Sequence, residues 1–180
     1  MRFRLVALLA VALGLSSVPA GAQFLSVGLK AGVPLNDAFS NDGFPGSDTK
    51  RYIIGPEVEV RLPFRLGVEF DALYRRYSVS GTSASEWQFP ILLKYHFKGV
   101  PLVHPFVDGG PVFNHVSDIG FATRNLSSAG FALGAGLDFR VLLLHITPEF
   151  RYVRMADANY GYLNFNQNQN QAQFLVGFTF

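Results

Sequence analysis

One short segment of the chain carries two residue types that together perform acyl chemistry. In FNHVSD, His115 and Ser117 are separated by one residue. Residues at i and i+2 of a strand lie on the same face, so the imidazole would act as base toward the hydroxyl, as ester hydrolysis requires. A triad also needs an acid that orients the histidine. Residues 119–148 contain no Glu, so Asp118 or Asp138 would have to serve. The competing interpretation is two ordinary polar residues at a strand end.

The other residues with ligand chemistry are dispersed. The four histidines lie at positions 96, 104, 115 and 145, so a metal site would need the fold to bring them together, and structural or solvated histidines are favoured. The chain has no cysteine, which excludes disulfides and cysteine-based zinc sites. We therefore predict no metal and no cofactor.

The elements that must position these residues are strands. Apolar and polar residues alternate with a period of two in eight segments, and no stretch keeps the 3.6-residue period of an amphipathic helix. The predicted strands cover residues 23–33, 51–62, 66–75, 87–97, 104–115, 130–139, 145–152 and 169–180.

Charged side chains fall almost entirely on one face of these strands. The opposite faces are nearly uncharged over about nine to eleven residues, the length that a tilted strand needs to cross a bilayer. Charges inside a narrow barrel must pair with one another, so we predict a salt-bridge network across the lumen. Its predicted members are Lys30, Glu57, Glu59, Arg61, Glu69, Asp71, Arg75, Lys94, Asp138, Glu149 and Arg151.

The same alternation also fits a soluble, lipocalin-like periplasmic binding barrel with inside and outside exchanged. Three features favour lipid outside. Aromatic residues stand near the ends of the neutral faces, as in an interfacial girdle. Glycines concentrate on the charged faces, which suits a crowded lumen. The chain also stops on Phe180 without a polar tail.

The connections differ in length at the two ends of the predicted strands. Segments 36–49, 81–85, 117–128 and 156–166 lie on one side, while the short segments 63–65, 98–102 and 139–141 lie on the other. This arrangement is typical of an up-and-down meander in an outer membrane. The predicted fold class is an all-β, closed, up-and-down antiparallel transmembrane β-barrel of eight strands, preceded by a signal peptide.

The first 22 residues are predicted to be that signal peptide. Arg2 and Arg4 precede an apolar run from residue 5 to 15, and Ala20-Gly21-Ala22 forms a small-residue cleavage site. The barrel domain is then residues 23–180. Removing the two arginines from the 15 Lys and Arg leaves 13, equal to the 13 Asp and Glu. A neutral mature chain gives no electrostatic support for nucleic acid as a partner.

Four prolines lie inside predicted strands, namely Pro56, Pro90, Pro111 and Pro148. Proline lacks the N–H that a sheet ladder uses, and it normally occupies edges or bulges. A closed barrel has no edges, so we expect bulges or strand ends at several of these positions.

Taken together, the export signal, the eight amphipathic strands and the closing segment FLVGFTF resemble the small outer-membrane β-barrels of the OmpA/OmpX type. The resemblance implies location in the outer membrane of a Gram-negative-type bacterium, among its lipids and lipopolysaccharide. It also implies that the last strand is read by the barrel-assembly machinery. The corresponding residues here are Phe174, Val176, Phe178 and Phe180.

Two functions remain open. The resemblance implies a non-enzymatic barrel with a plugged lumen, whose extracellular loops act in envelope integrity, adhesion or ligand contact. The alternative is a lipid-modifying enzyme, because His115 and Ser117 superficially resemble the His-x-Ser motif of lipid A deacylases. That family's orienting Glu has no counterpart in residues 119–148.

The terminal phenylalanine provides the first prediction. Replacing Phe180 with Ser should lower the amount of barrel in the outer membrane and expose the chain to periplasmic proteases, because the assembly signal is lost. Quantitative blotting of membrane fractions measures this. The control Asn41→Ser, in a predicted loop, should leave the amount unchanged. Equal membrane levels of the two variants would contradict the assignment.

Overall fold

The computed structural model describes residues 24–36, 52–79, 82–117, 126–141, 144–156 and 169–180. The side chains of residues 77–84, 116–117 and 126 lie outside the described part. The strands are β1 (Leu25–Pro34), β2 (Ile53–Arg61), β3 (Leu66–Asp71), β4 (Leu73–Val79), β5 (Thr82–His96), β6 (Val103–Ser117), β7 (Leu126–Val141), β8 (Leu144–Met155) and β9 (Asn170–Thr179), with one 3₁₀ turn, η1 (Pro63–Arg65). No described helix is long and apolar enough to cross a membrane.

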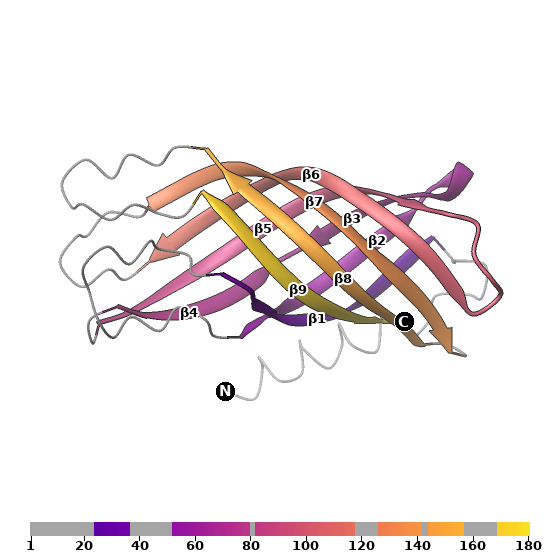
Figure 1. Ribbon diagram of the computed structural model, residues 1–180, viewed down its shortest axis with the longest axis horizontal. Coiled ribbons are helices and arrows are strands. Elements are labelled where there is room, and N and C mark those ends of the chain that lie inside the picture. Colours follow the sequence, from indigo (N-terminus) through magenta and orange to yellow (C-terminus); the bar gives the residue numbers. More distant parts are fainter. Residues whose placement is uncertain (1–23, 37–51, 80–81, 118–125, 142–143, 157–168) are drawn as a thin grey trace, which may run out of the picture.

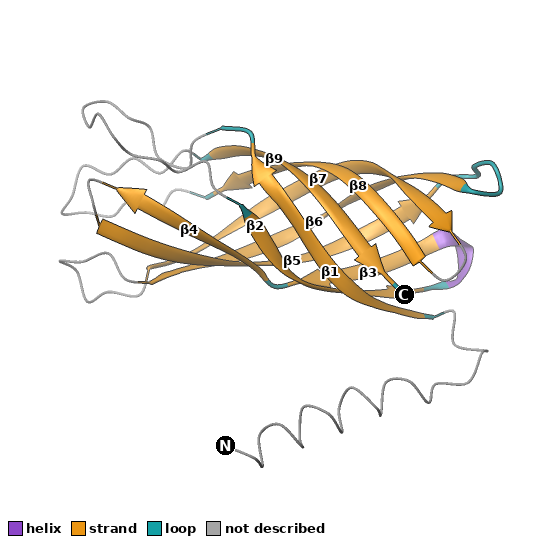
Figure 2. Cartoon of the chain, turned by 90° about the horizontal axis from the view of Figure 1, so that it is seen from below, coloured by secondary structure: helices purple, strands orange, loops and turns teal. Residues whose placement is uncertain are grey.

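The strands close into a single barrel (Figures 1 and 2). Neighbouring strands are antiparallel, and β1 pairs with both β2 and β9, so the first and last strands meet. The strands β3 and β4 are two halves of one barrel strand, since both lie between β2 and β5 and are separated only by Ala72. The predicted eight-stranded, closed, antiparallel barrel is confirmed.

The barrel buries its charges and exposes its apolar side chains. Lys30, Lys94 and Arg151 are fully buried, while Leu29 is 58% and Phe150 is 58% exposed. A soluble barrel has the opposite arrangement, because water favours charges outside and apolar groups inside. An apolar exterior instead matches the acyl chains of a bilayer. The lipocalin-like alternative is therefore wrong.

The prolines do not produce the bulges that we expected. The pairing register is unchanged on both sides of each proline, as in β2, where Ile54 pairs with Tyr74 and Glu57 pairs with Asp71. Instead, each proline lies in a local gap of the ladder, as between β7 and β8 beside Pro148. The barrel tolerates each missing donor as a gap of two bridges, without inserting a residue.

Two prolines explain the break between β3 and β4. The Ala72 N–H donates to the Pro56 carbonyl at 3.0 Å. Because the N–H and C=O of a strand residue point to the same side, the missing N–H of Pro56 also faces this strand. In the register of β5, Pro90 lies opposite Asp71 on the other side. Asp71 and Ala72 thus face a proline on each flank, and the strand loses its regular pairing there.

The two ends of the barrel differ as predicted in the lengths of their connections. The short turns β2–β3, β5–β6 and β7–β8 lie at the end that carries the C-terminus (Figure 2). One difference concerns residues 81–85, predicted to be a loop: β5 already begins at Thr82, so β4 and β5 form a longer hairpin than expected. We call the two ends the turn end and the loop end.

The orientation of the faces predicts the effect of a charge on the outer wall. Phe70 is 44% exposed and pairs with Val58 and Ile91 within the wall. Phe70→Arg should lower the free energy of unfolding by about 2–4 kcal/mol, because the guanidinium would face lipid. Urea unfolding in lipid vesicles measures this, with Phe70→Leu as the apolar control. Equal stability of the two variants would contradict the assignment of this face to lipid.

Candidate functional site: the charged lumen

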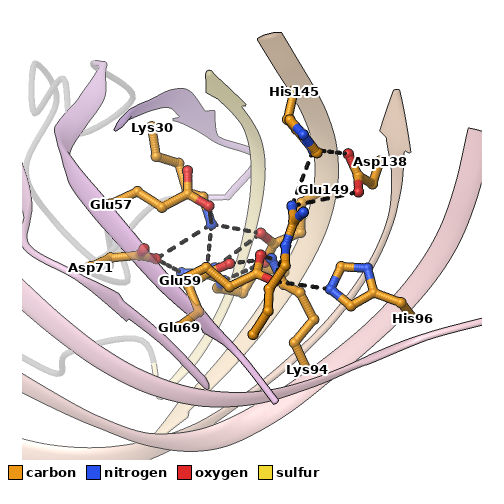
Figure 3. Close-up of polar contacts among 12 residues, drawn as sticks. Lys30, Glu57, Glu59, Glu69, Asp71, Lys94, His96, Asp138, His145 and Glu149 are labelled. Atoms are coloured by element: carbon orange, nitrogen blue, oxygen red, sulfur yellow. Dashed lines mark hydrogen bonds and ion pairs between the residues drawn. The ribbon is translucent and has the colours of Figure 1, made fainter. Parts of the chain in front are cut away.

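Glu69 of β3 is the centre of the charges in the lumen (Figure 3). Its Oε1 atom lies 2.5 Å from Lys30 Nζ on β1 and 2.8 Å from Arg151 Nη2 on β8. Its Oε2 atom contacts Lys94 Nζ on β5. One carboxylate therefore binds three cations that come from three other strands, and all four side chains are fully buried.

Arg151 and Lys30 also bind further carboxylates within this group. Arg151 donates to Asp71 Oδ2 at 2.8 Å and to Glu149 Oε1 at 2.5 Å. Lys30 Nζ lies 3.0 Å from Glu149 Oε2, 3.3 Å from Glu57 Oε1 and 3.5 Å from Asp71 Oδ2. We call Lys30, Glu57, Glu69, Asp71, Lys94, Glu149 and Arg151 the central cluster. It connects β1, β2, β3, β5 and β8 across the lumen.

A second group of charges lies toward the turn end. Glu59 binds His96 at 3.1 Å and Arg61 at 3.3 Å, and Lys94 at 3.5 Å joins it to the central cluster. On the other side of the lumen, Asp138 binds two basic side chains of β7 and β8. Its oxygens lie 3.0 Å from Arg140 Nε and 3.0 Å from His145 Nδ1. Arg61 Nη2 is 3.9 Å from Asp138 Oδ2, so it connects the two sides.

A third group lies toward the loop end. Arg75 Nη2 is 2.8 Å from Glu86 Oε2 and donates to Gln171 Oε1 at 2.7 Å. The Asn114 amide also donates to Glu86. Arg75 is thus the one predicted network residue that these contacts place apart from the others. The remaining ten are joined by ion pairs of 3.9 Å or less, among the pairs that the described residues form.

Several members of these groups were not predicted from the sequence. Glu86 lies between the predicted connection 81–85 and the strand predicted at 87–97, so the sequence pattern assigns it to neither. His96 and His145 fell on polar faces, but they were not counted as charged partners. Their alternation with apolar neighbours was the signal that would have placed them in the lumen.

The structure also brings three carboxylates close enough to suggest a metal site. One oxygen each of Glu57, Glu69 and Asp71 lies within 4.8 Å of the others. The Lys30 ammonium contacts all three carboxylates, at 3.3, 2.5 and 3.5 Å. A metal between these oxygens would have to displace this ammonium, so the triad as arranged does not fit a metal ion.

The acyl-transfer hypothesis meets a different geometry. His115 Nδ1 lies 3.2 Å from Ser127 Oγ on the neighbouring strand β7. Asp138 cannot orient this histidine, because it pairs with His104 at the other end of β6 and binds Arg140 and His145. That part of the hypothesis is wrong. Asp118 and the side chain of Ser117 lie outside the described residues.

The predicted assembly residues lie along the outer face of β9. Phe174 and Phe178 are exposed, and the Phe174 ring lies 5.8 Å from the Phe150 ring on β8. Phe180 exchanges two backbone hydrogen bonds with Val27, of 3.3 and 3.1 Å. The last residue thereby belongs to the seam that closes the barrel, with its ring largely exposed.

Comparison with known proteins agrees with this architecture. The family described as "Outer membrane protein beta-barrel domain" matches residues 7–180. The chain belongs to this outer-membrane β-barrel family. Among solved structures, Neisserial surface protein A is similar, with 16% identity, a TM-score of 0.60, and coverage of 87% of this chain and 95% of that one. The Ail attachment invasion locus protein of Yersinia pestis has 15% identity, a TM-score of 0.52 and the same coverages.

The protein is therefore an integral outer-membrane barrel with the fold of these two structures. Identities of 15 and 16% establish the fold alone. No curated protein matches the sequence. The function of this barrel must therefore be inferred from the residues of its own lumen and loop end.

The position of Glu69 predicts its contribution to stability. Glu69→Ala removes the carboxylate that binds three buried cations, and breaking a buried pair in this way costs about 3–5 kcal/mol. Urea unfolding in lipid vesicles measures the loss. Gln173→Ala is the control, because Gln173 makes a single lumen hydrogen bond to Gln88 at 3.3 Å, worth about 1 kcal/mol. A loss no larger than that of the control would contradict the central role of Glu69.

Proposed function

We propose that this protein is a non-enzymatic outer-membrane scaffold with a plugged lumen, and that its extracellular connections act in envelope integrity, adhesion or ligand contact. The observation that carries the proposal is the central cluster. Its ion pairs run from Lys30 on β1 and Glu69 on β3 to Lys94 on β5 and Arg151 on β8. Side chains from facing walls of the barrel therefore meet in the middle.

The size of the barrel supports a closed lumen. An eight-stranded barrel has an interior just wide enough for side chains to fill, in contrast to the aqueous channel of 16-stranded porins. Here, the charged residues of the interior are almost completely buried. An ion that crossed the barrel would have to break several pairs between buried groups, which is costly.

The length of three neighbouring strands supports a role for the loop end. The strands β5, β6 and β7 contain 15, 15 and 16 residues. A strand of 15 residues tilted by about 40° spans roughly 38 Å, more than the apolar band of about 25 Å. At the loop end, β7 extends beyond β8, whose pairing with it begins at Gly130. This wall would hold the connections clear of the lipid.

The remaining parts of the proposal concern partners. Outer-membrane lipids and lipopolysaccharide would cover the apolar wall, and the barrel-assembly machinery would read Phe174, Val176, Phe178 and Phe180. The name of the similar Ail protein describes attachment and invasion. That name is consistent with adhesion as one role of such a barrel. The plug and the raised loop end are the physical features that support the proposal.

A second candidate function is hydrolysis of an outer-membrane lipid. It is favoured by one observation, the 3.2 Å contact between His115 Nδ1 and Ser127 Oγ near the loop end. In this arrangement Ser127, a residue that the sequence did not indicate, is the described hydroxyl beside the imidazole. Among the contacts of the described residues, no acid orients His115, and a catalytic triad requires one. The scaffold is therefore the better supported function.

The plugged lumen predicts the electrical behaviour of the protein. Purified protein in a planar bilayer should show no steady unitary conductance, since the central cluster closes the barrel. A 16-stranded porin in the same bilayer serves as the positive control. Stable single-channel openings would contradict the plug. Release of fatty acid from lipopolysaccharide by the wild type but not by His115→Ala would support the enzymatic alternative instead.

A further inference from the structure

The outer wall of the barrel has a hollow near the loop end, on β5, β6 and β7. Its volume is about 310 Å³, and the residues that line it include Phe89, Phe113, His115, Ser127 and Ala129. It forms because large side chains of β6 stand beside small ones of β7. Phe113 pairs with Ala129, and His115 pairs with Ser127. A volume of this size is at the lower end of the range for ligand pockets. We call this feature the outer hollow.

The polar and apolar parts of the outer hollow follow a fixed order along the barrel. On β6, His115 lies two residues nearer the loop end than Phe113. On β7, which runs the opposite way, Ser127 lies two residues nearer the loop end than Ala129. Trp87 pairs with His115 and is exposed on the same wall, and tryptophan marks the boundary between membrane and water. The order from polar boundary to apolar interior is that of a membrane lipid.

The polar part of the outer hollow retains a hydrogen-bond donor. His115 Nδ1 lies 3.2 Å from Ser127 Oγ, so one of these groups donates to the other. A neutral imidazole has one N–H and a serine hydroxyl has one O–H, so this contact uses one of two donors. Neither side chain makes another hydrogen bond among the described residues. The second donor is free to bind an acceptor from outside the chain, such as the ester or amide carbonyl of a lipid.

A cation flanks the outer hollow on β8. Arg154 pairs with the exposed Phe131 of β7, so both lie on the outer wall, and Ala129 is two residues from Phe131 on the same face. Arg154 and Ala129 are therefore diagonal neighbours, about 7–8 Å apart and within reach of a long side chain. The Arg154 side chain has no ion pair or hydrogen bond in the described part of the protein. A guanidinium on this wall is disfavoured among acyl chains, whereas a phosphate neutralises it and accepts two of its N–H groups.

We propose that the outer hollow binds lipopolysaccharide through its lipid A portion. One acyl chain lies over Ala129 and against the rings of Phe89 and Phe113. The carbonyl that links this chain to the sugar accepts the free donor of the His115 and Ser127 pair, and a phosphate binds Arg154. The assignment rests on the proposed function, in which lipopolysaccharide surrounds the apolar wall. Lipid A carries phosphates without a balancing cation, whereas the ammonium of phosphatidylethanolamine already neutralises its phosphate.

Titration with purified lipid A tests this assignment. The protein is extracted from membranes, freed of lipid by washing in a nonionic detergent, and titrated with lipid A, phosphatidylethanolamine or phosphatidylglycerol. Native mass spectrometry counts the lipid molecules that remain on each barrel. The wild type should bind lipid A at one saturable site, and more tightly than either phospholipid. Binding at this site requires no cleavage of the lipid.

Two matched substitutions on β7 locate the acyl chain. Ala129→Phe fills the outer hollow and should lower the affinity for lipid A at least about tenfold, because several methylene groups lose their contacts. Ala135→Phe is the control, because Ala135 is exposed on the same face of β7 but lies farther toward the turn end. It should keep the wild-type affinity. Both variants add an apolar ring to an apolar wall, so both should fold.

A third substitution tests the phosphate contact. Arg154→Gln should lower the affinity for lipid A about tenfold, since a hydrogen bond between charged groups is lost. Its binding of phosphatidylethanolamine should stay as weak as in the wild type, because that head group needs no cation.

Each of three results would overturn the assignment. Equal affinities of Ala129→Phe and Ala135→Phe would place the lipid elsewhere on the wall. Wild-type affinity of Arg154→Gln for lipid A would exclude this arginine as the phosphate ligand. Equal affinity of the wild type for lipid A and phosphatidylglycerol would make a phospholipid the occupant. None of these results bears on the plugged lumen, which conductance tests separately. Steady channel openings together with lipid A bound in the outer hollow would refute the plug alone.

Discussion

The pairing of buried charges is the constraint on which this structure depends. A bilayer requires an apolar exterior, so every polar side chain on the strands must point into a lumen that is too narrow for much water. Charges confined there are tolerated only when they meet partners of opposite sign. Glu69 meets this requirement for three cations at once. Because these cations come from β1, β5 and β8, the pairing also fixes how the walls face one another.

The backbone obeys a related constraint. In a closed barrel each strand needs a partner on both flanks, and lipid offers no substitute for a missing hydrogen bond. The register nevertheless continues unchanged past Pro56, Pro90, Pro111 and Pro148. The unchanged register shows that closure of the barrel outweighs the loss of a few backbone hydrogen bonds between strands. Two of the four gaps meet at Asp71 and Ala72, where two prolines flank one strand.

These constraints apply to different parts of the molecule. The central cluster makes the lumen a structural core, in which a substitution changes stability before it changes anything else. The outer wall must stay apolar along the lipid. Toward the loop end, the pairing requirement still applies to the buried Arg75 and Glu86.

The sequence by itself determined the architecture of this protein. Strict alternation over eight segments, together with the charge on one face of each, was sufficient for strand number, face and closure, because side chains of a strand alternate with period two. It was also sufficient to name ten of the residues that the ion pairs join. The pattern within one strand carries this information, because each strand must by itself present apolar side chains to the bilayer.

Only the tertiary structure decided which charges meet. Lys30 and Glu149 are far apart in the sequence, and their 3.0 Å contact follows from the closure of the barrel and the stagger of its strands. The same holds for His115, which contacts Ser127 across the sheet. Cross-lumen contacts depend on curvature, register and side-chain reach, and none of these is encoded in the pattern of a single strand.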